Sequence, residues 1–230
     1  MSEQQEHAHL DPLTHVAQPD HPDAVADARA RAGRAIRDVG HALVGHHAPI
    51  EMVDRVTAQL DALTSDLLLG ASRSRAEASQ VGEWDGPPKD GESLITYDER
   101  PVSGRASPWG LDLTVERQGD EIVTQVTLRA GHEGAPGRSH GGIVAALFDD
   151  VFGFVLTMLA QPAYTGEITV RYEAGTPIGV PLECRVRLAE RSGRKLLMTG
   201  ELRDGEQVVA RSKATFIAID REAFRRNAAG

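Results

Sequence analysis

The stretch Gly137-Arg-Ser-His-Gly-Gly-Ile-Val-Ala-Ala-Leu-Phe-Asp-Asp-Val-Phe-Gly153 decides the fold of this chain. It opens a run that stays almost wholly apolar as far as residue 160, which predicts a helix buried on nearly every side. Glycines at its start leave backbone N–H groups free and approachable. A carboxylate on such a helix is unexpected, because burial of an unpaired charge costs several kcal/mol. Asp149 and Asp150 therefore mark a candidate functional site.

Composition and charge exclude several classes of protein. The chain has 230 residues, 40% hydrophobic and 26% charged, and a net charge of −9, which argues against a general nucleic-acid binder. Its one cysteine, Cys184, allows no intrachain disulfide and fits a reducing compartment. The N-terminus lacks a signal-peptide pattern, and two aspartates interrupt the most apolar helix. We therefore predict a cytoplasmic protein without a membrane span or a nucleic-acid partner.

The N-terminal part differs in composition from the remainder. Residues 1–21 are polar and carry four histidines without ligand spacing, which predicts a disordered tail and no metal site. Residues 22–70 are expected to form a helical extension, and residues 71–92, rich in Ser, Gly and Pro, to form a linker. The first helix has an apolar stripe at Val25, Ala28, Ala32, Ile36, Val39 and Leu43. The second has one at Val53, Val56, Leu60, Leu63 and Leu67, with coiled-coil spacing, which is expected to pack on the main domain or on a partner subunit.

From residue 93 to residue 220 the pattern is that of strands around one helix, before a C-terminal tail at 221–230. Apolar residues alternate with polar ones before and after the apolar helix, and Asp204-Gly205 is a strong hairpin signal. Hairpins in series predict an antiparallel sheet. The fold class expected is α+β, with a sheet wrapped around one long central helix that also meets a second subunit.

Several local motifs together resemble the hotdog-fold acyl-CoA thioesterases, in their phenylacetate-pathway and THEM-type branch. The segment Glu133–Gly137 precedes His140-Gly141-Gly142, and the acid of that branch falls nine residues after the histidine, at Asp149. Thr165 stands seven residues before Tyr172, as in the family. The resemblance covers about residues 95–219. It implies a hotdog fold, hydrolysis of an acyl-CoA substrate, a homodimer or homotetramer, and no cofactor, since CoA belongs to the substrate.

The resemblance also implies roles for individual residues. Asp149 would act as general base or nucleophile, and amides at Gly141 and Gly142 would form the oxyanion hole. His140 would fix this turn, and Thr165 would hold the catalytic water or orient the acid. Contacts to CoA would come from Arg138, Arg171, Gly193, Arg194 and Lys195.

Two positions depart from the family pattern. Some relatives carry an asparagine six residues before the histidine, where this chain has Gly134. The loop from Tyr172 to Pro177 carries an extra residue or two.

Helix geometry constrains how such a site is assembled. Asp149 lies roughly 13 Å along the helix axis from His140, so one helix cannot bring its own acid to its own N-terminus. The site is therefore expected where two copies of the chain meet, with Asp149 buried in an apolar wall. Asp150 points about 100° away and is expected to be solvated or paired at the interface. A hotdog hydratase or dehydratase and a non-catalytic acyl-CoA-binding module remain as alternatives.

Overall fold

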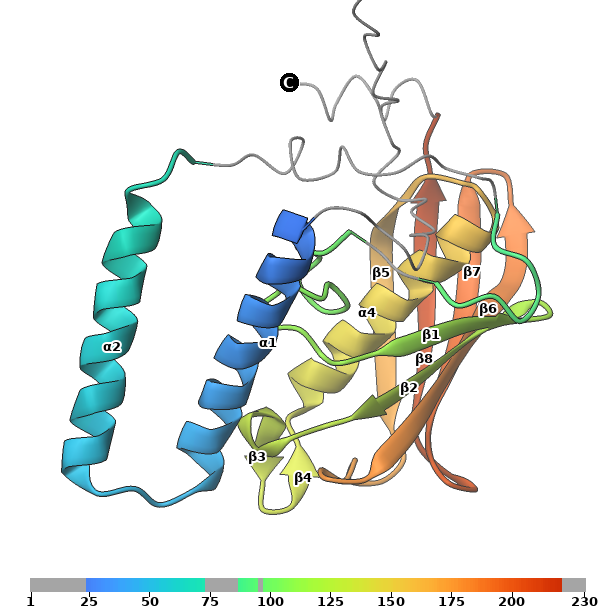
Figure 1. Cartoon of the computed structure of the whole chain (residues 1–230). Coiled ribbons are helices and arrows are strands. Elements are labelled where there is room, and N and C mark those ends of the chain that lie inside the picture. Colours follow the sequence, from blue (N-terminus) through green and yellow to red (C-terminus); the bar gives the residue numbers. More distant parts are fainter. Residues whose placement is uncertain (1–23, 73–86, 95–96, 221–230) are drawn as a thin grey trace, which may run out of the picture.

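The computed structural model describes residues 24–72, 87–94 and 97–220 and shows a six-stranded antiparallel sheet packed on one long helix (Figure 1). The sheet order is β1-β2-β6-β7-β8-β5. Its strands are β1 (Thr114–Gln118), β2 (Glu121–Thr127), β5 (Ala163–Tyr172), β6 (Pro181–Ser192), β7 (Lys195–Asp204) and β8 (Gln207–Ala218). The predicted hotdog fold is confirmed. The tails expected at 1–21 and 221–230 lie outside the described residues.

The central helix α4 (Gly141–Met158) forms the core with one face of the sheet. Its side chains Phe148, Phe152 and Phe154 are among the most deeply buried in the chain. Gly200 in β7 makes the close approach possible, because a Cβ there would lie 3.1 Å from the Phe148 ring. By length and composition α4 could cross a membrane, but 56% of it is buried inside this fold, as in the core helix of a folded domain.

Short elements join β2 to α4 and shape the helix start. The 3-10 helix η1 (Ala130–His132) leads into a small hairpin of β3 (Glu133–Ala135) and β4 (Arg138–Ser139). Gly137 turns this hairpin with a φ of 69°, a conformation that glycine adopts without strain. The sequence pattern did not reveal these elements, because each is too short to show a periodicity.

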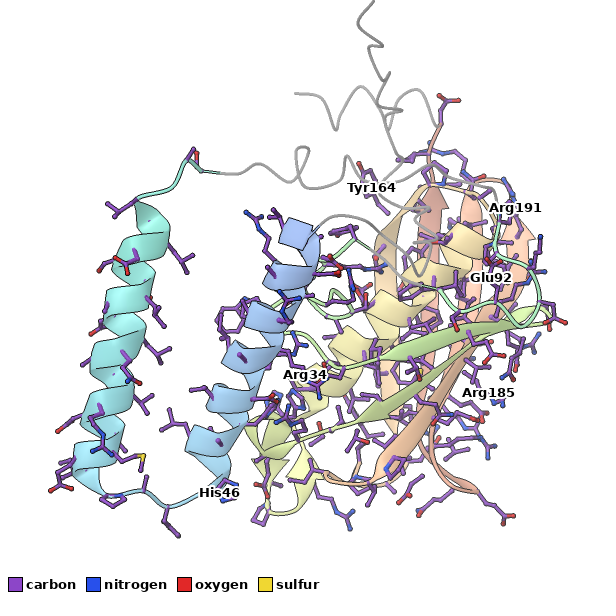
Figure 2. The ribbon with its side chains drawn as sticks, in the orientation of Figure 1. Arg34, His46, Glu92, Tyr164, Arg185 and Arg191 are labelled. Carbon is purple, nitrogen blue, oxygen red and sulfur yellow. The ribbon has the colours of Figure 1, made fainter. Side chains whose placement is uncertain are left out.

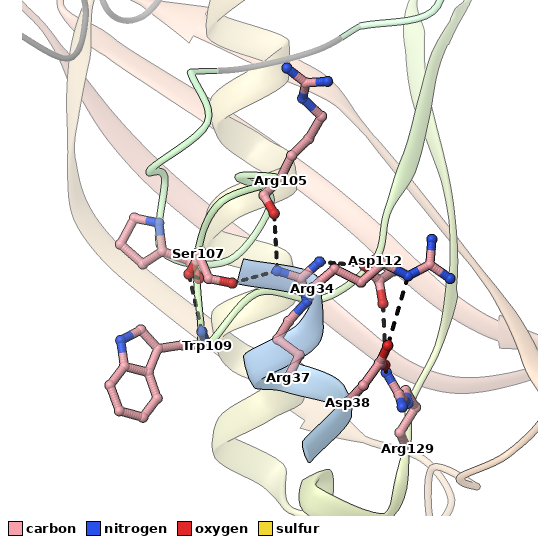
Figure 3. A network of polar contacts seen from close by, with 9 residues as sticks. Arg34, Arg37, Asp38, Arg105, Ser107, Trp109, Asp112 and Arg129 are labelled. Carbon is pink, nitrogen blue, oxygen red and sulfur yellow. Dashed lines mark hydrogen bonds and ion pairs between the residues drawn. The ribbon is translucent and has the colours of Figure 1, made fainter. Parts of the chain in front are cut away.

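Two helices precede the sheet, α1 (Ala24–Gly45) and α2 (Ile50–Leu68). α1 docks on the irregular segment 97–113 through Gly33 and Arg37, both buried. The Arg37 guanidinium donates to the carbonyls of Arg105 (3.1 Å) and Ser107 (2.5 Å) and pairs with Asp112 at 2.7 Å (Figure 3).

The apolar stripe of α1 does not make this contact. Ile36, Val39 and Leu43 are 48%, 39% and 52% exposed, and the docked face is formed by a glycine and an arginine instead. In α2 no residue is buried. The helix stands apart from the sheet in Figure 1, with α1 between them. The predicted apolar stripes are therefore present on the helices, but they face outward in the described chain.

Two glycines on α1 allow a matched test of its docking. A Cβ at Gly33 would lie 2.5 Å from the Ala106 carbonyl oxygen, whereas a Cβ at Gly40 would meet nothing within 4 Å. We expect Gly33→Ala to lower the free energy of unfolding by roughly 1–3 kcal/mol, through overpacking against backbone. Gly40→Ala should raise it by roughly 0.5–1 kcal/mol through helix propensity. Urea denaturation of both variants measures the difference, and equal effects would contradict the docking described.

Candidate active site

The start of α4 leaves one backbone amide without an acceptor. His140 is the N-cap, and its Nδ1 accepts from the Gly142 N–H at 3.0 Å. The Ile143 N–H donates to the His140 carbonyl, also at 3.0 Å. Among the described residues no hydrogen bond engages the Gly141 N–H, which sits at the positive end of the helix dipole. Of the two predicted oxyanion donors, Gly141 is thus the one whose amide is available.

The hairpin before His140 is built around Gly134. A Cβ at this position would lie 2.8 Å from the His140 Cα, so the backbones approach too closely for any side chain. An asparagine at this position would therefore have to displace the His140 backbone. The His140 N–H in turn donates to the His132 carbonyl at 2.8 Å, which fixes the cap on η1.

Asp149 meets Thr165, which comes from a different element. The Thr165 hydroxyl donates to Asp149 Oδ1 at 2.9 Å. A register shift between Thr165 and Glu167 interrupts the pairing of β5 with β8, and a bulge of this kind re-aims nearby side chains. In the single chain both side chains of this pair are exposed at the edge of the sheet, so the expected burial of Asp149 between two copies stays a prediction.

Asp150, rather than Asp149, is the buried carboxylate of α4. It is 7% exposed, and Arg100 Nε donates to its Oδ1 at 2.6 Å, so the expectation that it is solvated or at an interface is wrong. Arg100 also donates to the Asp150 carbonyl and stacks 5.0 Å from the Phe154 ring centroid. Gly153 leaves the space for this guanidinium. Burial raises the pKa of Asp150, and Arg100 and the Ser103 hydroxyl oppose that shift.

Tyr172 ties the far end of β5 to the start of α4. Its hydroxyl donates to the Gly141 carbonyl at 2.7 Å, and a Cβ on Gly141 would lie 3.1 Å from the same oxygen. The tyrosine therefore orients the peptide next to the available amide. The sequence showed only that Tyr172 stands seven residues after Thr165, and its contact with Gly141 is visible only in the fold.

The predicted CoA-contacting residues fall into two groups. Gly193, Arg194 and Lys195 lie in and beside the β6–β7 turn, at the end of the sheet where β5 begins, with Gly193 at a φ of 58°. In the sheet register Thr165 pairs with Phe216, which pairs with Leu196, so this turn is two strands, or about 10 Å, from Thr165.

The second group lies at the opposite end of β5, beside the start of α4. Arg171 precedes Tyr172 and pairs with Glu173 at 3.2 Å, and Arg138 packs beside Gly175. Basic side chains therefore lie near both ends of β5, with Arg194 and Lys195 near its start and Arg138 and Arg171 near its end. Within the described residues, no three His, Cys, Asp or Glu side chains gather as a metal site would require.

Comparison with known proteins agrees with this geometry. Residues 137–211 match the family model of the thioesterase superfamily. Acyl-coenzyme A thioesterase THEM5 of Mus musculus is 27% identical over 92 residues, covering 39% of this chain and 37% of that protein. THEM4 of Xenopus laevis is 28% identical over 87 residues, 38% of this chain and 39% of the relative. The chain thus matches less than half the length of these relatives.

A solved structure matches over a longer range. The crystal structure of a thioesterase superfamily protein superposes with a TM-score of 0.70 at 25% identity, covering 89% of this chain and all of that one. Residues 137–211 are thus similar in sequence to the thioesterase superfamily. Residues 93–220 make up only part of that 89%, so the similarity to this structure extends into the segment before the sheet.

α1 contacts the turn that carries the helix cap. The Gly131 N–H donates to His41 Nδ1 at 3.0 Å, and the His41 and His132 rings lie edge to face at 4.6 Å. Arg129 pairs with Asp38 of α1 at 2.6 Å. The Arg129 N–H donates to His132 Nδ1, so the buried imidazole must stay unprotonated there. α1 is therefore connected to His140 through η1.

The buried imidazole gives a pH prediction. Burial lowers the pKa of His132 to about 4, and the nearby charges of His41 and Arg129 act in the same direction. The unfolded chain therefore binds the extra proton first, and we expect the free energy of unfolding to fall as the pH drops from about 6.5 to about 4. His132→Asn keeps an acceptor for the Arg129 amide and should flatten this dependence.

The control is His47→Asn, a change at an exposed histidine between α1 and α2. Urea denaturation at several pH values compares the slopes of the two variants with that of the parent chain. A slope that His132→Asn leaves unchanged would refute the assignment to His132.

Proposed function

We propose that this chain hydrolyses acyl-CoA thioesters to the free acid and CoA. The single observation that carries the proposal is the hydrogen bond from Thr165 to Asp149 on a helix whose first amide is available. A carboxylate held by a hydroxyl group and an N–H at a helix start are the two components that thioester hydrolysis requires. The superfamily match supports the reaction class.

The two components divide the chemistry between them. The Gly141 N–H would donate to the thioester carbonyl oxygen as negative charge develops on it. Asp149 would accept a proton from water while the water oxygen bonds to the carbonyl carbon, or would itself attack that carbon. In either route the carbon–sulfur bond breaks and the CoA thiolate leaves and takes up a proton. In the second route water then hydrolyses the acyl anhydride on Asp149, which releases the free acid and restores the carboxylate. Thr165 would orient the carboxylate or the water.

The site would form between two copies of the chain. Gly141 and Asp149 are eight residues apart on one straight helix, a separation of about 12 Å. Asp149 and Thr165 are exposed beside β5, which is an edge strand of the sheet and has one side unpaired within the described chain. A second copy against this edge would bring its own Gly141 to the acid and bury the pair.

The position of the β6–β7 turn supports a CoA substrate. Arg194 in the turn and Lys195 at the start of β7 lie next to Leu196, which is two strands from Thr165 in the sheet register. These cations would contact a phosphate group of a CoA thioester bound at Asp149. Cys184 is free and fully buried, so no described cysteine competes as the nucleophile. A cytoplasmic location and the acyl group remain predictions.

Asp149→Asn tests the assigned acid. This exposed substitution keeps the hydrogen bond to Thr165, so the fold should be unchanged, but it removes the basic oxygen. We expect hydrolysis, measured as free thiol released across acyl-CoAs from acetyl to palmitoyl, phenylacetyl and benzoyl, to fall at least 10²-fold. Asp120→Asn, in the exposed β1–β2 turn, is the matched control and should turn over like the parent chain. Undiminished turnover in Asp149→Asn would exclude its role.

Gly141 allows the backbone donor to be removed. Proline at the first helical position fits, since it needs no N–H there, and the His140 ψ of 134° suits a residue before proline. We expect Gly141→Pro to lower kcat by roughly 10²–10³ relative to Gly141→Ala, which keeps the N–H. Both variants add a Cβ beside Tyr172, so equal rates would mean that this amide is not the oxyanion donor.

Mixing the two inactive variants tests the shared site. If Asp149→Asn and Gly141→Pro subunits exchange, mixed dimers regain one intact site and activity returns toward a quarter of the parent level. A mixture that exchanges subunits but stays inactive would contradict a site made of two chains.

The hydratase alternative has less support in the geometry. His140 uses Nδ1 as the helix cap, a positioning role rather than proton transfer to a substrate. Incubation with crotonyl-CoA separates the activities, because thiol release is expected and addition of water across the double bond is not.

A further inference from the structure

The two N-terminal helices each present an apolar stripe that the described chain leaves exposed. On α1, Ile36 and Leu43 are about half exposed, because this helix docks through its other face. On α2, Leu60, Leu63 and Leu67 are 40%, 57% and 77% exposed. Figure 2 shows side chains projecting around α2, with no other described element packed against it. Exposed apolar area of this extent is typical of a surface that binds another protein.

The two stripes match each other in spacing. The stripe of α2 runs over Val53–Leu67, and that of α1 over Val25–Leu43, both at steps of three and four residues. Stripes with this spacing pack knobs into holes on another helix. Ala28 and Ala32 have short side chains, so a second helix can approach the first half of α1 closely. Each stripe therefore fits a helix of the same kind, and charge selects which one.

The charges of the two helices are opposite. α1 carries four arginines and two aspartates, a net charge of +2, whereas α2 carries four carboxylates and one arginine, a net charge of −3. The exposed Arg31 directly precedes the stripe residue Ala32, and the exposed Asp61 directly follows Leu60. Adjacent residues lie 100° apart around a helix, so these charges stand at the margins of the stripes. Pairing α2 with α2, or α1 with α1, would bring like charges together, and pairing α2 with α1 brings opposite charges together.

The arrangement of the two helices in one chain assigns the pairing to two copies. α2 has no buried residue, so α1 of the same chain does not cover its stripe. The connection 46–49 is only four residues long and ends at Pro49, the N-cap of α2, whose ring fixes its φ near the observed −60°. The two helices of one chain could meet only if this connection changed its conformation. A second copy can reach both stripes in the arrangement that the structure shows.

We infer that α2 of one copy packs on α1 of a second copy through the Val53–Leu67 and Val25–Leu43 stripes, and that the second copy returns the same contact. Such a reciprocal exchange is an interface of the kind that closes a dimer. It covers the exposed stripes of both helices with a single type of contact. The contact uses surfaces that the proposed active site does not use.

A pair of cysteines in the full chain tests the exchange. Ile36 and Leu60 lie near the middle of their stripes, so they meet whether the paired helices run parallel or antiparallel. The native Cys184 is fully buried, and burial raises the pKa of its thiol, so it does not compete. We expect Ile36→Cys with Leu60→Cys to form a disulfide-linked dimer under mild oxidation, seen on a non-reducing gel. Each single variant should give at least tenfold less dimer, because its cysteine faces no second thiol.

The other pairings give different products. A dimer formed equally well by Leu60→Cys alone would mean that α2 pairs with α2 and would overturn the inference. A monomer of the double variant that has lost both introduced thiols would place the contact within one chain, and a monomer that keeps both would show no contact. Either result would also refute the exchange. Ile36→Cys with Ala58→Cys, on the opposite face of α2, is the matched control and should give at least tenfold less dimer.

Charge reversal tests the reason given for the pairing. Asp61→Lys with Asp66→Lys changes the net charge of α2 from −3 to +1 and leaves its apolar stripe intact. Added to the two cysteines, this change should reduce the crosslinked dimer at least tenfold at low salt. Asp120→Lys with Glu206→Lys, the same charge change in two exposed turns of the sheet, should leave it unchanged. Equal crosslinking by the two reversed chains would contradict the charge argument. None of these measurements depends on thioester hydrolysis.

Discussion

The ion pair between Asp150 and Arg100 connects the central helix α4 to segment 97–113, and through that segment to α1. Arg100 belongs to the irregular segment 97–113, and its guanidinium holds both the side chain and the carbonyl of Asp150. α1 then docks on the same segment through Arg37. Removing one partner of a buried pair leaves an uncompensated charge and costs about 3–5 kcal/mol. The carboxylate of Asp150 on an apolar helix therefore has a structural reason, and its exposed neighbour Asp149 is the one we propose for catalysis.

The length of α4 then determines that the proposed active site needs two copies of the chain. α4 is one continuous helix, so Gly141 and Asp149 of the same chain cannot approach each other. Asp149 is paired with Thr165 at the exposed edge of the sheet, while Tyr172 orients the Gly141 peptide at the other end of the same strand. Strand β5 thus supports both half-sites, one near each of its ends. Two copies that meet antiparallel along this edge would complete two sites at once, which is the symmetry expected of a closed dimer.

The sequence was sufficient for elements that show a period and insufficient for contacts between distant segments. Alternation and hairpin signals such as Asp204-Gly205 predicted the sheet, and the apolar run predicted α4. Asp149 was distinguished from Asp150 by family spacing, not by burial, and the expectation for Asp150 was wrong because its partner lies 50 residues earlier in a loop without a pattern. Gly134 shows the same limit: only the fold reveals that the His140 backbone lies against it. Side-chain periodicity reports which face of a helix is apolar, but not what covers that face.

α1 shows why that distinction matters. Its docking is polar and directional, through Arg37 and the pair of Asp38 with Arg129 (Figure 3) and through His41, while its apolar stripe faces outward. Exposed ion pairs contribute little free energy, whereas several hydrogen bonds of fixed direction determine position. Such contacts fit a helix that sets the place of η1, and η1 holds the backbone of His140. α1 is therefore connected through η1 to the backbone of His140 at the start of α4.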